Sequence, residues 1–278
     1  MCTRGLRCKL LRINAPAQCA DDEFKLSLRA RCGSAKAQVE PLGDENLVMR
    51  WTLPHLTALA AVCMALLASH ASLRAADIEK MQQAAARQGP KATAAVKALQ
   101  ALLVSIGNSD DDSRLQAINQ FYNRRIQFRD DVDVWGQVDY WASPLELLEK
   151  GQGDCEDYVI AKYFSLISLG MPSSKLRLVY VRALLGGPGG DVQAHMVLAY
   201  YPTAVSSPLS AQQSDPLILD NLISEIRPAS RRPDLTPVFS FNSEGLWQGV
   251  NGAADGDPLV RLSRWREVVS KARIEGFL

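Results

Sequence analysis

The spacing of apolar residues changes once along this chain, and the change restricts the folds that it can adopt. Up to residue 170, apolar side chains recur every three or four positions, which predicts helices. From Leu176 onward the period is two, so Leu176–Leu185 and Ala194–Tyr201 are predicted as strands. The glycine-rich turn 186–190 between them predicts an antiparallel hairpin. Helices first and strands second predict an α+β domain.

Capping and breaking residues place the ends of these elements. The expected helices are Asp77–Gln88, Lys91–Ile106, a helix capped by Asp110, Leu145–Glu149, Cys155–Leu169 after Asp154, and Leu262–Ala272. Short strands are expected over Pro216–Asp220 and near Val238-Phe239, whereas 130–141 lacks a period and predicts a loop. Cys155 then lies on the inward face of its helix, four residues before Val159.

The N-terminal residues differ from the rest. Met49-Arg50-Trp51 opens a short apolar stretch that ends in Ser69-His70-Ala71, which predicts a signal peptide over 49–71 and export of the protein. An uncleaved anchor or a core helix is the alternative. Residues 1–48 precede this start and carry four of the six cysteines, so we interpret them as a disordered upstream extension. One domain is expected over 77–278.

Charge excludes one class of partner. After residue 71 the chain carries 22 Lys and Arg against 24 Asp and Glu, a formal charge of 22 − 24 = −2. A protein that binds nucleic acid usually presents a basic surface, and this balance offers none, so nucleic acid is not expected as a partner.

Cys155 is the single cysteine after residue 71, and an exported domain with one cysteine cannot form an internal disulfide. It stands at a predicted helix start, where the helix dipole and free amides favour a thiolate, so its pKa should fall. We interpret Cys155 as a nucleophile. The alternative is a small buried apolar residue, the common fate of a free cysteine.

Two further residues complete a candidate catalytic set. His195 is the single histidine after residue 71 and the one imidazole there that can serve a thiol as a base. Asp220 ends an apolar strand and can orient that base by accepting from its second ring nitrogen. The alternatives are a core histidine and a turn aspartate, and Asn221 competes with Asp220 for the orienting role.

The acidic residues Asp154, Glu156 and Asp157 surround the candidate nucleophile. Like charges beside a thiol raise its pKa, which opposes its use. A bound divalent cation would remove this objection, and Ca²⁺ suits a site made of oxygen ligands. A solvated helix start is the alternative. Asp131-x-Asp133-x-x-Gly136 resembles the opening of an EF-hand loop but fails at Trp135 and Ala142, so we reject that motif.

Four stretches carry a family resemblance. They are Trp135-Gly136 with Asp139-Tyr140-Trp141-Ala142, Gly151-Gln152-Gly153-Asp154-Cys155-Glu156-Asp157-Tyr158, Ala194-His195-Met196-Val197-Leu198, and Leu219-Asp220-Asn221. Together they resemble the bacterial transglutaminase-like cysteine proteinases, and within that family the LapG-like periplasmic proteases. The resemblance covers roughly residues 77–250, and the run around Cys155 is its most specific part.

The resemblance implies a papain-like or transglutaminase-like core in which the nucleophile helix packs on an antiparallel sheet. It implies a triad of Cys155, His195 and Asp220, and calcium dependence with Asp154, Glu156 and Asp157 at the metal site. It also implies a periplasmic enzyme that cuts a large surface adhesin near its N-terminus and releases cells from a biofilm. An inner-membrane receptor for cyclic di-GMP is the implied regulatory partner.

The expected reaction is therefore hydrolysis of a peptide bond through a thioester on Cys155. The same three residues could instead transfer the acyl group to an amine, as a transglutaminase does. A catalytically inactive binding module that retains the fold is a third reading.

Overall fold

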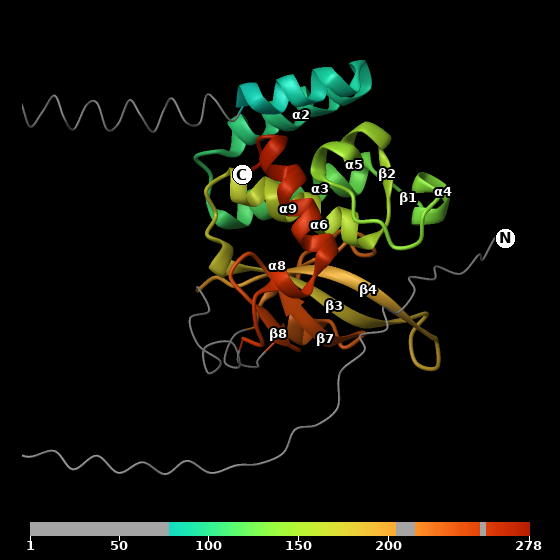
Figure 1. The fold of residues 1–278 in the computed structure, drawn as a ribbon. Coiled ribbons are helices and arrows are strands. Elements are labelled where there is room, and N and C mark those ends of the chain that lie inside the picture. The colour runs from blue at the N-terminus through green and yellow to red at the C-terminus, as the bar shows by residue number, and fades with distance from the viewer. Residues whose placement is uncertain (1–77, 204–214, 251–253) are drawn as a thin grey trace, which may run out of the picture. The chain divides into compact units, whose positions relative to one another are not determined.

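Helices and a sheet form two layers in the computed structural model, which describes residues 78–203, 215–250 and 254–278. The helices lie on one side of the sheet (Figure 1). The prediction of an α+β domain with helices first is confirmed. The predicted extension 1–48 and signal peptide 49–71 lie outside the described residues.

The predicted helices are present in the predicted order, and the structure adds two short helices that were not predicted, Asp131–Trp135 and Pro258–Arg261. Residues 78–88 are helical, and the further helices are α2 Pro90–Ile106, α3 Asp111–Arg125, α4 Asp131–Trp135, α5 Pro144–Lys150, α6 Cys155–Ser168, α8 Pro258–Arg261 and α9 Ser263–Ile274. Short 3₁₀ turns cover Ser173–Lys175 and Ala229–Arg231. The prediction of a loop is wrong for Asp131–Trp135, where acidic residues at the first turn favour a helix start and left-handed Gly136, at φ 65°, ends it.

Six strands form one antiparallel sheet. Their order is β6-β5-β4-β3-β7-β8, and they are β3 Leu176–Leu185, β4 Asp191–Tyr200, β5 Leu217–Leu219, β6 Arg227–Pro228, β7 Leu235–Phe241 and β8 Leu246–Gln248. The predicted hairpin of β3 and β4 is confirmed, with Leu176 opposite Tyr200 and Leu185 opposite Asp191. Strand β5 pairs with the C-terminal end of β4, with Leu219 opposite Leu198 and Leu217 opposite Tyr200.

Helix α6 is the central element of the core. Residues 155–166 of this helix are all buried, so it contacts neighbours on every side. Helix α9 covers it with Trp265, whose ring stacks on Phe164 at 5.5 Å and meets Phe241 of β7 edge-on at 5.2 Å. This burial fixes the position of the first residue of α6, which is Cys155.

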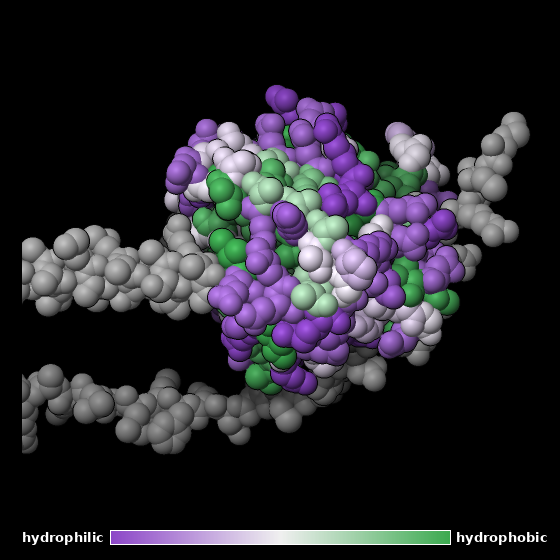
Figure 2. Space-filling model, turned by 90° about the horizontal axis from the view of Figure 1, so that it is seen from above, coloured by the Kyte–Doolittle hydropathy of each residue, from purple (hydrophilic) through white to green (hydrophobic). Residues whose placement is uncertain are grey.

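The surface on the side of α2 intersperses polar with apolar side chains (Figure 2). Within the described segments, none of the helices combines the length and the apolar character that crossing a bilayer requires.

Candidate active site

The chain enters helix α6 through a tightly built turn. Gly151, at φ 67°, ends α5, and β2 Gln152–Gly153 then pairs in parallel with β1 Gln127–Phe128. A Cβ on Gly153 would lie 2.5 Å from Asp157 Oδ2 and 2.6 Å from Leu147 Cδ1, so only glycine fits between α5 and the start of α6. Asp154 then occupies the N-cap position, as predicted, and Cys155 is the first helical residue.

Strands β4 and β5 supply the other two predicted residues. His195 lies on β4 and Asp220 directly follows β5, so the antiparallel pairing of these strands places them side by side. His195 Nε2 is 2.8 Å from Asp220 Oδ1, and the side chains are 6 % and 0 % exposed. Cys155 and His195 line one small pocket, whose other walls include Phe128, Leu185 and Leu222. The structure therefore brings together the three side chains that the sequence singled out.

The Asp220 carboxylate is ionised although it is buried. Burial alone would raise its pKa, but the hydrogen bond and charge of His195, the Leu222 amide and Arg232 together hold that pKa well below its usual range. Arg232 Nη2 lies 2.8 Å from Asp220 Oδ2, and the Leu222 amide donates to Oδ1 at 3.0 Å. Because an ionised carboxylate only accepts, the hydrogen in the His195 bond is on Nε2. Nδ1 is then the ring nitrogen that can act as a base.

Sequence reasoning missed Arg232. It stands in a loop-rich region after β6, next to Arg231, and no periodicity distinguishes the two. In the structure Arg232 is 3 % exposed and bridges Asp220 and Asp234. Only the pairing of β5 with β6 brings it to the site.

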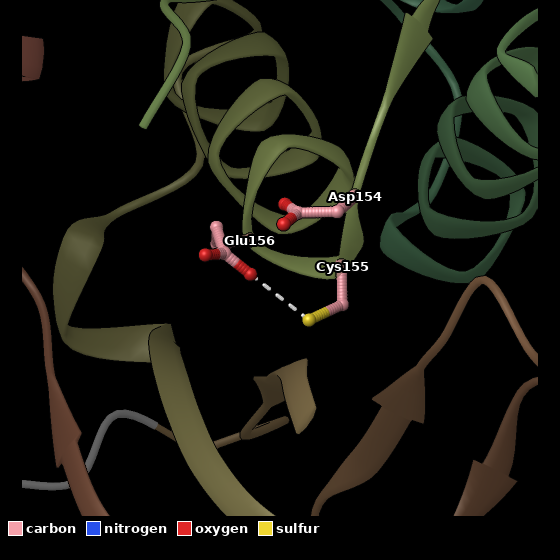
Figure 3. A group of neighbouring side chains, drawn as sticks. All are labelled: Asp154, Cys155 and Glu156. Atoms are coloured by element: carbon pink, nitrogen blue, oxygen red, sulfur yellow. Dashed lines mark hydrogen bonds between the residues drawn. The ribbon is translucent and has the colours of Figure 1, made fainter. Parts of the chain in front are cut away.

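The thiol has a carboxylate partner on its own helix. Cys155 Sγ donates to Glu156 Oε2 at 2.9 Å (Figure 3). A donating thiol carries its proton, and a neighbouring negative charge opposes loss of that proton. Burial raises the pKa of Glu156, while the hydrogen bond from Cys155 lowers it. This hydrogen bond favours the thiol form of Cys155 over the thiolate.

Buried carboxylates gather next to this pair. One oxygen from each of Asp131, Asp154 and Asp157 lies within 4.8 Å of the others, and Asp154 also groups in this way with Cys155 and Glu156. Burial raises the pKa of Asp131 to about 7 and that of Asp157 well above its usual value, and the Glu156 charge adds to both shifts. The predicted metal residues Asp154 and Asp157 thus lie together, with Glu156 on the thiol side of Asp154.

Asp131 joins this group although the EF-hand motif that contains it was rejected. It is 5 % exposed, its Oδ2 accepts from the Tyr140 amide at 2.5 Å, and its Oδ1 has no hydrogen-bond partner among the described residues. A buried carboxylate oxygen without a partner, beside other carboxylates, fits the oxygen ligand set of a divalent cation. Its position at the start of α4 was not predicted, because that helix was expected to be a loop.

Backbone amides tie the segment between α4 and α5 to the acidic group. Tyr140 N donates to Asp131, and Ala142 N donates to Asp157 at 2.7 Å. These two bonds fix this segment to the acidic group beside Cys155.

Comparison with known proteins decides the family. The sequence profile described as "Bacterial transglutaminase-like cysteine proteinase BTLCP" matches residues 97–234. A solved structure of Legionella pneumophila LapG is 36 % identical, with a TM-score of 0.57, over 70 % of this chain and 96 % of that chain. This chain belongs to the bacterial transglutaminase-like cysteine proteinases.

Two further structures of the same relative agree. EGTA-treated LapG from Legionella pneumophila is 38 % identical, with a TM-score of 0.59, over 70 % of this chain and 96 % of that chain. Calcium-bound LapG from the same organism is 37 % identical, with a TM-score of 0.58, over 70 % of this chain and 98 % of that chain. No curated protein gave a match. Family membership confirms the predicted fold class and makes this protein a LapG-like cysteine peptidase.

Gly153→Ala tests the construction of the turn before Cys155. The new methyl group would overlap Asp157 and Leu147, so we expect the start of α6 to shift and alkylation of Cys155 by iodoacetamide to change in rate, with a loss of roughly 1–3 kcal/mol in the free energy of unfolding. Urea denaturation and mass spectrometry of the Cys155 peptide measure the two effects. Gly107→Ala, at an ordinary φ of −58° and with its nearest new contact at 3.3 Å from the Leu103 carbonyl oxygen, is the milder control. Equal behaviour of the two variants would contradict the account.

Proposed function

We propose that this protein is an exported, calcium-dependent cysteine endopeptidase in which Cys155 is the nucleophile, His195 the base and Asp220 the residue that orients His195. The observation that most directly supports this proposal is the 2.8 Å hydrogen bond between His195 and Asp220. It lies beside the pocket that His195 shares with Cys155. A base held by an ionised carboxylate next to a thiol is the arrangement that nucleophilic acyl transfer needs.

The proposed reaction has two halves. His195 Nδ1 takes the thiol proton, and Cys155 Sγ attacks the scissile carbonyl carbon. Collapse of the tetrahedral species breaks the C–N bond, while His195 gives its proton to the leaving amine, so a thioester remains. Water then loses a proton to His195 and attacks the thioester, which releases the carboxylic product and restores Cys155. Asp220 holds the ring and stabilises the imidazolium throughout.

The acidic residues explain why calcium belongs to this proposal. Asp131, Asp154, Glu156 and Asp157 offer oxygen ligands, and Asp131 Oδ1 has no hydrogen-bond partner among the described residues. When bound there, calcium supplies positive charge that balances these carboxylates and lowers the cost of forming a thiolate. The calcium-bound structure of the Legionella relative supports this choice of cation.

The proposed setting follows the likeness to LapG. We place the enzyme in the periplasm after removal of the signal peptide, with the N-terminal region of a large cell-surface adhesin as its substrate. Cleavage there would release cells from a biofilm. An inner-membrane cyclic di-GMP receptor of the LapD type is the proposed regulatory partner. The support is that this chain matches 96 % to 98 % of the length of its LapG relatives.

A cleavage assay tests the peptidase. The mature protein is incubated with the N-terminal region of a large adhesin from the same cell, and products are sized and sequenced. The wild type is expected to cut one site, whereas Cys155→Ala, with an unchanged melting temperature, should leave the substrate intact because no acyl-enzyme can form. Cleavage by Cys155→Ala would overturn the proposal. Incorporation of an added amine, without hydrolysis, would favour the transferase.

Asp131→Asn tests the metal site with a control on the same short helix. The change removes a buried carboxylate, so we expect calcium affinity to fall by at least about tenfold, by isothermal titration, and the rise in melting temperature with calcium to shrink. EGTA should stop cleavage by the wild type. Asp133→Asn, whose side chain is exposed, should bind calcium as the wild type does. Equal loss in both variants, or indifference to EGTA, would remove calcium from the account.

A further inference from the structure

Lys162 is a charged residue that the proposed reaction does not use. It lies on α6 seven residues after Cys155, and therefore two turns further along the same face of the helix. Its side chain is completely buried. Nζ lies 5.7 Å from the centre of the Tyr158 ring and has no hydrogen-bond partner among the described residues. An isolated ammonium group in a protein core is costly, so a buried lysine normally has polar neighbours that balance it.

The neighbours of Lys162 on its helix face show what it faces. Tyr158, four residues earlier, donates from its hydroxyl group to the Ile126 carbonyl oxygen at 2.6 Å. Ser165, three residues later, shares a 2.8 Å hydrogen bond with the hydroxyl group of Tyr122. Both partners belong to α3 or its C-terminal end. Lys162 stands between these two contacts and therefore at the packing of α6 against α3.

Helix α3 carries two asparagines that flank Tyr122 and bond to the segment after β5. Asn123 Nδ2 donates to the Asp220 carbonyl oxygen at 2.7 Å, and Asn119 Nδ2 donates to that of Ser224 at 3.0 Å. Their side-chain oxygens are buried without hydrogen-bond partners among the described residues, as is Oδ1 of Asn221. We call Asn119, Asn123 and Asn221 the asparagine cluster.

The hydrogen-bonding groups of Lys162 and of this cluster are complementary. The cluster presents three acceptor oxygens, and the ammonium group of Lys162 presents three donors. Asp220 adds a negative charge in the same region, because its field raises the pKa of Lys162 against the burial that lowers it to about 7. Buried water commonly satisfies polar groups that cannot reach one another directly.

We propose that buried water links the Lys162 ammonium group to the asparagine cluster, and that this link positions Asp220 for its bond to His195. Lys162 is then a positioning residue, and this role rests on the triad of the proposed function. The two cationic side chains near Asp220 act differently. Arg232 binds the carboxylate directly, whereas Lys162 acts through water on the asparagine cluster, in which Asn123 bonds the carbonyl oxygen of Asp220.

A high-resolution crystal structure of the wild-type protein tests the link. We expect at least one ordered water within hydrogen-bond distance of Lys162 Nζ and of an oxygen of the asparagine cluster. A dry junction, or Nζ bonded directly to protein groups elsewhere, would overturn the proposal. This readout does not depend on whether any variant folds.

Lys162→Met tests the positioning role in solution. Replacing a buried charge by an apolar chain of similar length should leave the protein as stable as the wild type or more so. At pH 6, below the pKa of Lys162, and at saturating calcium, we nevertheless expect Cys155 to react with iodoacetamide roughly 2- to 30-fold more slowly, the range seen for residues coupled to a site without touching its ligand. The downfield proton signal of His195 Nε2–H should move upfield or exchange away.

Two comparison variants separate the outcomes. Ser165→Ala removes a buried hydrogen bond one turn from Lys162 and should lower stability while leaving the alkylation rate and the His195 signal unchanged. Asp220→Asn gives the alkylation rate and the His195 signal expected when the triad is lost completely. A wild-type rate and signal in Lys162→Met, beside a slow Asp220→Asn, would overturn the positioning role alone. A wild-type rate in Asp220→Asn would instead overturn the triad.

Discussion

The candidate site depends on one buried carboxylate that stays ionised. Asp220 is fully buried, and an unpaired charge in such a place would cost several kcal/mol. His195 occupies one of its oxygens together with the Leu222 amide, and Arg232 occupies the other. Arg232 is fixed in turn by Asp234 at 2.8 Å. This line of charges fixes which imidazole nitrogen carries a hydrogen, and so leaves Nδ1 for the thiol.

Cys155 stands between this basic arrangement and an acidic one. On its own helix the thiol donates to Glu156, next to the buried carboxylates of Asp131, Asp154 and Asp157. The Asp157 carboxylate also has a structural role. It accepts hydrogen bonds from the backbone amides of Asp154 and Ala142 and so joins the loop to the start of the helix. The carboxylates that shape the turn therefore also disfavour the thiolate form of Cys155, because they place negative charge beside it. The proposed calcium site would resolve that conflict and couple the chemistry to calcium.

The sequence predicted most of the frame, because its signals there are local. Helix α6, the hairpin of β3 and β4, and the cap at Asp154 follow from period, glycine and capping residues close together in the chain. The residues Cys155, His195 and Asp220 were found because each is scarce or ends a strand. Arg232 and Asp131 were missed, because their roles arise only when distant segments meet. The short helix that carries Asp131 was also missed, since five residues are too few to show a period.

Lys162 shows the same limit from within a correctly predicted element. Its position on the inward face of α6 follows from the spacing, yet the asparagines to which we propose that it is linked come from α3 and from the segment after β5. From the sequence alone, a lysine on an apolar helix face departs from the pattern and has no evident role. At buried polar residues of this kind, the local sequence pattern does not predict the role of the residue in a functional site.

The most direct test of the central claim is whether His195 and Asp220 act as one unit on Cys155. The rate of Cys155 alkylation is measured at fixed pH and saturating calcium for His195→Ala, Asp220→Asn and the double variant. Because Asp220 is held to work through His195, the double variant should be about as slow as His195→Ala alone. If the two losses multiply, the residues act independently and the account is wrong.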